Sequence, residues 1–195
     1  MVEPVLEAAF QEAEHVVILC VPAKLSGVYN AFRLGASNFP PDKVTLVDSG
    51  QVAMALGWQV LIAAEMAEAT GDLQKMLDAI QRVRANQCLY AALDTLEYLR
   101  LSGRVGWAGA SIGALLQIKP ILDVREGEVK SYARVRTFKR AFDELVNLAR
   151  EQAPLDRLAI IHTANEKGAR ELKEALKDIA PENTFIMNVT PTIGT

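Results

Sequence analysis

The chain has 195 residues, half of them hydrophobic, and a formal net charge of −3 at pH 7. This length and composition suffice for a globular protein with one sizeable core or two small ones. The weakly acidic balance gives no indication of a general affinity for nucleic acid or for an anionic membrane. No apolar run has the length of a membrane span, and the N-terminus has no pattern of a secretory signal peptide. We therefore expect a cytoplasmic protein without stable membrane insertion.

Apolar strands and helices alternate along the chain, which predicts an α/β fold with two adjacent sheets. We expect strands at residues 15–21, 44–47, 88–93, 121–124, 129–133, 158–161 and 185–189, with a tight turn at Glu126-Gly127 that joins 121–124 and 129–133 as an antiparallel hairpin. We expect helices at residues 3–14, 28–34, 52–69, 72–84, 95–101, 107–115, 137–150 and 166–179. The helix at 52–69 has apolar residues nearly all the way round and is expected to be buried. A domain boundary is placed near residue 87, which gives an N-terminal Rossmann-like domain at 1–86 and a second α/β domain at 87–195.

The junction between the first strand and the helix that follows it is the strongest candidate for a binding site. Pro22 ends the pairing of the strand, and Ser26 stands where the helix is expected to begin. Ligands of open α/β sheets bind at the carboxyl ends of strands, where a helix N-terminus offers free N–H groups to an anion. Two interpretations stay open at this point: Ser26 caps the helix, or it binds a ligand.

The other motifs give weaker evidence for a functional site. Gly109–Gly113 matches the G-x-S-x-G pattern of serine hydrolases, with Ser111 as the nucleophile. That motif needs a strand leading into the serine, and residues 104–108 make a poor strand, so close helix packing explains the glycines better. Residues His162–Asn165 follow a strand and could contact a ligand. The cysteines Cys20 and Cys88 and the two histidines have no metal-ligand spacing, so we expect no metal site and free, buried thiols.

A basic segment without any acidic residue runs from 130 to 141. Such a run is usually a solvated surface, and the alternative is a docking surface for an acidic partner or a phosphate group. Its cationic residues are Lys130, Arg134, Arg136, Lys139 and Arg140.

Several segments, in this order, resemble the DegV family of bacterial fatty-acid-binding proteins. They are Lys24–Tyr29, Val47–Ser49, Leu93–Arg104, Leu115–Leu122 and Arg134–Thr137, so the resemblance spans nearly the whole chain. Family members usually begin with a strand that carries an aspartate-serine-threonine motif and a threonine-bearing loop, both absent here. They also continue beyond the equivalent of Thr195 into a histidine-threonine-glycine-proline-glycine segment. The resemblance therefore implies a two-domain DegV-like fold with an incomplete N-terminal domain, truncated at both ends.

The resemblance also implies a function. It predicts a non-catalytic carrier of a long-chain fatty acid such as palmitate, whose carboxylate is bound between the two domains and whose tail lies in an apolar tunnel. Ser26 and Gly27 are the expected ligand-binding residues. A separate ATP-dependent fatty acid kinase subunit would take up the carboxylate as an acyl-phosphate for phospholipid synthesis, with Arg104 and Arg136 as candidate docking residues. No cofactor and no nucleic acid are expected; the alternative function is a serine hydrolase or acyl transferase using Ser111 or Ser26.

Overall fold

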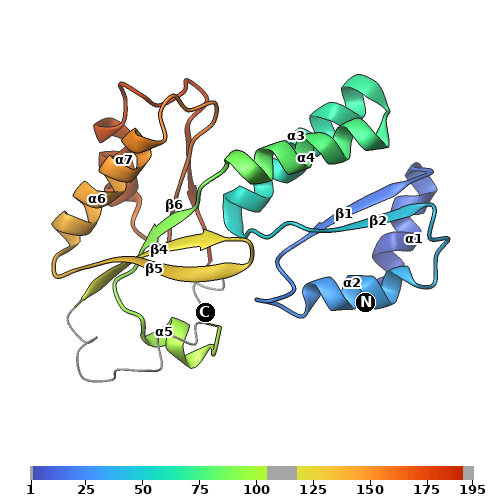
Figure 1. Cartoon of the computed structure of the whole chain (residues 1–195), viewed down its shortest axis with the longest axis horizontal. Helices are drawn as coiled ribbons and strands as arrows, with labels where there is room; N and C mark the ends of the chain where they lie inside the picture. Colours follow the sequence, from blue (N-terminus) through green and yellow to red (C-terminus); the bar gives the residue numbers. More distant parts are fainter. Residues whose placement is uncertain (1, 105–117, 191–195) are drawn as a thin grey trace. The chain divides into compact units, whose positions relative to one another are not determined.

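The computed structural model of the chain describes residues 2–104 and 118–190, in which helices and strands alternate as expected (Figure 1). The chain divides into two compact units. The first unit comprises Met1–Leu89 together with Val124–Glu128, and the second comprises Tyr90–Asp123 and Val129–Thr195. The expectation of an α/β fold is therefore confirmed, but the described residues form three sheets and not the two expected. The predicted helix at 107–115 and the Ser111 motif lie outside the described residues.

The first unit is built on two parallel strands, β1 (Val16–Cys20) and β2 (Val44–Asp48). Their register pairs Val16 with Val44 and Cys20 with Asp48, so the two strands end side by side. Helices α1 (Glu3–Glu12) and α2 (Val28–Ala36) pack against them around the buried side chains of Leu6, Ile18 and Cys20. Helices α3 (Ala53–Thr70) and α4 (Leu73–Asn86) lie side by side in the same unit (Figure 1).

Helix α2 is longer than its sequence indicates. The expected loop begins at Gly35, but the helix continues through that residue to Ala36. A Cβ atom at position 35 would stand 2.6 Å from Cγ1 of Val2, so the glycine permits close packing of the N-terminal segment. The structure therefore shows a helical glycine where the sequence pattern indicates a helix end, because a tertiary contact outweighs the local preference.

Helix α3 is not buried in the way its composition predicts. Ala55, Gln59 and Ala63 are its buried residues, whereas Val60 and Leu61 are 44% and 42% exposed. The small side chains at 55 and 63 make the inner face of the helix, while larger apolar side chains remain on its surface. The prediction that this helix is buried on all sides is wrong.

The second unit contains an antiparallel and a parallel sheet. Its elements are β3 (Tyr90–Ala92), α5 (Glu97–Leu101), most of β4 (Lys119–Arg125) and β5 (Glu128–Val135), α6 (Phe138–Glu151), β6 (Ala159–His162), α7 (Glu166–Ala175) and β7 (Phe185–Asn188). In the described residues the strand order is β3-β4-β5 in one sheet and β6-β7, parallel, in the other. Helix α6 packs on the first sheet around Ile121, Ala141 and Leu148, and α7 packs against both strands of the second.

The predicted β4–β5 hairpin forms around the expected tight turn. Glu126 and Gly127 at the turn have φ angles of +50° and +69°, the left-handed conformations that two-residue hairpin turns require. The tip of this hairpin, Val124–Glu128, belongs to the first unit, although the rest of both strands belongs to the second. We call this segment the hairpin tip. Within the described part of the chain, no helix combines the length and apolarity needed to cross a membrane.

Candidate functional site

Ser26 lies in a tight turn between β1 and α2. The N–H groups of Leu25 and Ser26 both donate to the carbonyl of Pro22, at 2.9 and 3.0 Å. The helix begins at Val28 as expected, but its N-cap is Gly27 and not Ser26, and the Ser26 hydroxyl accepts a hydrogen bond from the N–H of Val28 at 3.3 Å. Ser26 thus satisfies one N–H of the first turn from outside the helix. No acceptor among the described residues takes its hydroxyl proton, so this partly exposed hydroxyl can donate to water or to a ligand.

The Asp48 carboxylate joins the turn after β1 to the turn after β2. One of its oxygens accepts from the N–H of Ala23 at 3.1 Å, and the other accepts from the N–H of Gly50 at 2.9 Å. Because the register places Cys20 beside Asp48, both turns lie at the same carboxyl edge of the β1–β2 sheet. We call this region the carboxyl edge: residues 22–27 and 48–51. It is the location at which α/β proteins commonly bind ligands.

The hairpin tip packs on the carboxyl edge. The N–H of Gly127 donates to the carbonyl of Gly50 at 2.8 Å, and Lys24 forms an ion pair of 3.0 Å with Glu128. Gly127 is buried, and a Cβ atom there would stand 2.9 Å from Cβ of Pro22. Only a glycine allows the tip to approach the edge this closely while keeping a positive φ. No sequence pattern indicated this contact.

Buried polar side chains hold the backbone of the carboxyl edge through hydrogen bonds. The Ser49 hydroxyl lies within hydrogen-bond distance of the carbonyls of Cys20 (2.7 Å) and Gln51 (2.9 Å) and accepts from the N–H of Gln51. The side-chain amide of Gln51 donates to the Val124 carbonyl, and that of Gln59 donates to the Ser49 carbonyl. Ser49 and Gln59 are fully buried. The network therefore fixes the residues between β2 and α3 and joins them to the hairpin tip.

Two titratable groups near the carboxyl edge, Cys20 and Glu126, have shifted pKa values. Burial raises the pKa of the Cys20 thiol, and the negative charge of Asp48 adds to this shift. Hydrogen bonding from Arg84 lowers the pKa of Glu126 at the hairpin tip. Both groups therefore keep one protonation state near neutral pH: Cys20 is a thiol and Glu126 is a carboxylate. Neither the edge nor the rest of the described chain has a cluster of three or more metal-ligating side chains.

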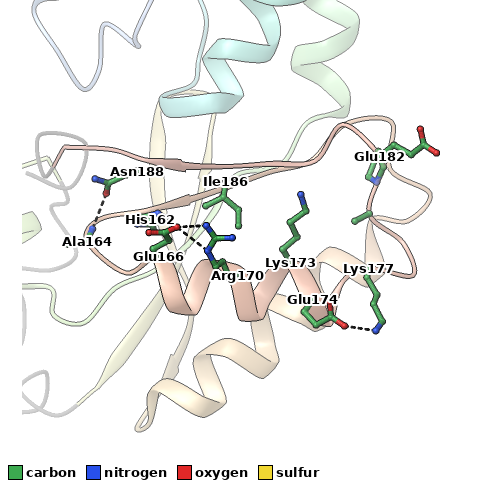
Figure 2. Close-up of a pocket in the computed structure, with 12 residues that line it drawn as sticks. His162, Ala164, Glu166, Arg170, Lys173, Glu174, Lys177, Glu182, Ile186 and Asn188 are labelled. Carbon is green, nitrogen blue, oxygen red and sulfur yellow. Dashed lines mark hydrogen bonds and ion pairs between the residues drawn. The ribbon is translucent and has the colours of Figure 1, made fainter.

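A second candidate is a cavity of about 1060 Å³ in the second unit, beside α7 and the β6–β7 sheet, lined by both charged and apolar residues (Figure 2). The loop after β6 borders it: Asn188 accepts from the N–H of Ala164, and Nδ1 of His162 accepts from the N–H of Asn165. His162 therefore has a local structural partner as well as a place in the cavity wall. The cationic side chains of the cavity bond to neighbours: Arg170 to Glu166, Lys177 to Glu174, and Lys173 to the Thr184 carbonyl. With its charges balanced in this way, the cavity favours no class of ligand.

The predicted site residues lie in both units. Ser26 and Gly27 are at the carboxyl edge of the first unit, half-buried and exposed respectively. Arg104, after α5, and Arg136, between β5 and α6, are exposed in the second unit. Exposure allows contact with a partner protein but does not identify one. Asp48 belongs to a segment that the sequence singled out, whereas the roles of Arg84 and of the hairpin tip at the carboxyl edge were not predicted.

Comparison with known proteins decides the family. A family model described as an uncharacterised protein of the DegV family matches residues 2–195. This chain belongs to the DegV family. A DegV domain-containing protein of Streptomyces coelicolor is 37% identical over 172 residues, covering 87% of this chain and 60% of the relative. The chain thus spans less than two thirds of the length of this DegV relative.

Solved DegV structures share the fold. A DegV family protein from Thermus thermophilus, described for its fatty acid binding, has a TM-score of 0.84 and 30% identity, covering 96% of this chain and 68% of the other. A Thermotoga maritima protein whose structure reveals a fatty acid binding function has a TM-score of 0.78 and 26% identity, covering 95% and 66%. The resemblance to the DegV family and its fold is therefore confirmed, and both of these structural neighbours are described as binding fatty acids.

Proposed function

We propose that the chain binds a long-chain fatty acid, with its carboxylate at Ser26 and Gly27. The observation that carries this proposal is the Ser26 hydroxyl, which stands before the first turn of α2 with its proton available to an acceptor. A carboxylate beside Ser26 would accept hydrogen bonds from the hydroxyl and from N–H groups at the start of α2. The dipole of this nine-residue helix also favours a negative charge at its N-terminus. The DegV relatives that bind fatty acids support the choice of ligand.

We further propose that the bound fatty acid is a cargo and not a substrate of this chain. Its carboxylate would lie in a cleft between the two domains, and its tail in an apolar tunnel. A separate, ATP-using kinase of the cytoplasm would then phosphorylate the carboxylate: a carboxylate oxygen attacks the terminal phosphorus of ATP, and ADP leaves. The resulting acyl-phosphate would enter phospholipid synthesis. Arg104 and Arg136, both exposed, are the proposed docking residues for an acidic surface of that kinase.

Lipid extraction from the purified chain tests the binding proposal. We expect native mass spectrometry to show a bound fatty acid in the wild type, and denaturing extraction to release it. The variant Ser26→Ala should lose most of the lipid. Ser37→Ala is the matched control, because Ser37 is an exposed serine just after the other end of α2. Equal lipid in Ser26→Ala and Ser37→Ala would reject Ser26 as the carboxylate ligand, and no lipid in any form would reject binding by this chain.

Charge reversal tests the docking proposal. With a DegV-dependent fatty acid kinase and palmitate, we expect Arg136→Glu and Arg104→Glu to slow acyl-phosphate formation while the carrier still binds palmitate. Arg82→Glu, at an exposed arginine on α4, controls for the change in net charge. If both reversals leave the rate unchanged, these arginines are not docking residues.

A further inference from the structure

Arg84 connects three segments of the first unit that are distant in sequence. From α4, its Nη1 donates to the carbonyl of Asp48 at 2.8 Å and its Nε donates to Glu126 at 3.0 Å. Nη2 bonds to the other carboxylate oxygen of Glu126, so the guanidinium holds that carboxylate with two nitrogens. This two-point geometry is the strongest form of the arginine–carboxylate interaction, and lysine cannot reproduce it.

Gly50 makes room for the guanidinium. Its φ is +65°, and a Cβ atom at this position would stand 2.8 Å from Nη2 of Arg84. The guanidinium therefore lies directly against the turn that follows β2. The same turn accepts a bond from Gly127 of the hairpin tip through the Gly50 carbonyl. Arg84 and the hairpin tip thus fix one turn from two directions.

Two series of contacts connect Arg84 to the turn that carries Ser26. Arg84 bonds to the backbone of Asp48, and the carboxylate of that residue bonds to Ala23, three residues before Ser26. On the other side, Glu126 is followed by Gly127, which packs on Pro22, and by Glu128, which pairs with Lys24. Pro22 is in turn the acceptor that closes the Ser26 turn. Both routes from Arg84 therefore end on the turn that carries Ser26.

We infer that Arg84 is a positioning residue for the carboxyl edge, which holds the Ser26 turn in its binding geometry by locking Asp48 and the hairpin tip together. Arg84 acts through these groups and not as a ligand contact. The hairpin tip is then a structural part of the binding site. The inference rests on the proposed function where it concerns ligand affinity, but its structural part can be measured without any ligand.

The test uses the full chain and a double-mutant cycle of Arg84→Gln and Glu126→Gln. The ligand-free readout is amide hydrogen exchange at Ala23, Gly50 and Gly127. We expect each single variant to accelerate this exchange about fivefold, and the double variant to add little, because both remove the same interaction. Exchange in the β6–β7 sheet should not change. Since Glu126 is an exposed turn residue, Glu126→Gln keeps the test valid if Arg84→Gln fails to fold.

The second readout is palmitate affinity, measured by titration after delipidation. We expect Arg84→Gln and Glu126→Gln to weaken it about fivefold, with Arg84→Lys no better than Arg84→Gln. Arg150→Gln is the matched control, because Arg150 also holds a carboxylate, that of Asp178, with two nitrogens, here Nη1 and Nη2, within the second unit. Unchanged amide exchange at the three sites in both single variants would overturn the inference. If the wild type binds no palmitate, the proposed function fails, and the exchange data still decide whether Arg84 positions the edge.

Discussion

The Asp48 carboxylate accepts a hydrogen bond from the N–H of Ala23 at 3.1 Å, so a side chain at the end of β2 fixes the turn after β1. Its other oxygen holds the N–H of Gly50 in its own turn. A single side chain therefore sets the spacing of the two turns that form the carboxyl edge. This relationship explains why an acidic residue stands near a proposed carboxylate site: the negative charge of Asp48 is stabilised by hydrogen bonds from two backbone N–H groups.

Removal of the Asp48 carboxylate should destabilise the protein and weaken ligand binding. Asp48→Ala leaves two N–H groups without their acceptor. A hydrogen bond to a charged group typically contributes about 1.5–3 kcal/mol to the free energy of unfolding. Because the site is only half-buried and water can replace part of the loss, we expect a decrease of about 1–2 kcal/mol in the free energy of unfolding. Asp48→Asn keeps one acceptor and should lose less. Urea unfolding measures both, and an equal loss for the two variants would contradict this role.

The sequence predicts those features of the site that depend on residues adjacent in the chain. The apolar run before Pro22 and the serine after it predict a strand end and a helix start, and both exist within one or two residues. The N-cap of α2 is Gly27 and not Ser26, and the serine hydroxyl bonds to the first turn from outside the helix. The tight turn at Glu126–Gly127 was equally visible from its residues.

The contacts that complete the site were not predictable in this way. Arg84 and Glu126 are 42 residues apart, and their pairing depends on how α4 and the hairpin tip pack. Sequence patterns report which face of an element is apolar, and they contain no signal for an ion pair between two charged residues of different elements. The surface exposure of Val60 and Leu61 was missed for the same reason: composition shows that α3 is apolar, but only packing shows which side is covered.

Acid should abolish the contribution of the Arg84–Glu126 pair. The pKa of Glu126 is lowered from 4.5, chiefly by its hydrogen bond to Arg84, so the folded state favours the carboxylate. The resulting stabilisation is fully present above the ordinary value of 4.5 and is lost as the pH falls through the lower folded value. We expect the wild type to be more stable than Glu126→Gln at pH 7 and the difference to vanish in acid. Unfolding measured across this range checks it, with Glu7→Gln on α1 as a control for charge; a difference independent of pH would contradict the prediction.

The two cysteine thiols should differ in reactivity. Cys20 is 3% exposed and its pKa is raised by burial and by Asp48, so both access and thiolate formation are disfavoured. The expectation that Cys88 is buried is wrong: it is half-buried, with Nη2 of Arg125 at 3.5 Å from its sulfur. We expect a thiol reagent at pH 8 to modify Cys88 first in the native protein, and Cys20 only on unfolding. Mass spectrometry of the labelled peptides assigns the sites, and modification of both at the same rate would show that the carboxyl edge opens in the native state.

Loss of the Ser49 hydroxyl should be the most destabilising single-atom change at the edge. Ser49 is fully buried, and its hydroxyl bridges the end of β1 to Gln51 while accepting the Gln51 N–H. In Ser49→Ala this N–H loses a partner in a place that water does not reach, so we expect a loss of about 1–3 kcal/mol in the free energy of unfolding. Ser37→Ala, at an exposed serine whose hydroxyl bonds to the last turn of α2, should cost less than about 0.5 kcal/mol. Similar urea midpoints for the two variants would mean that water enters beneath the edge and replaces the hydroxyl.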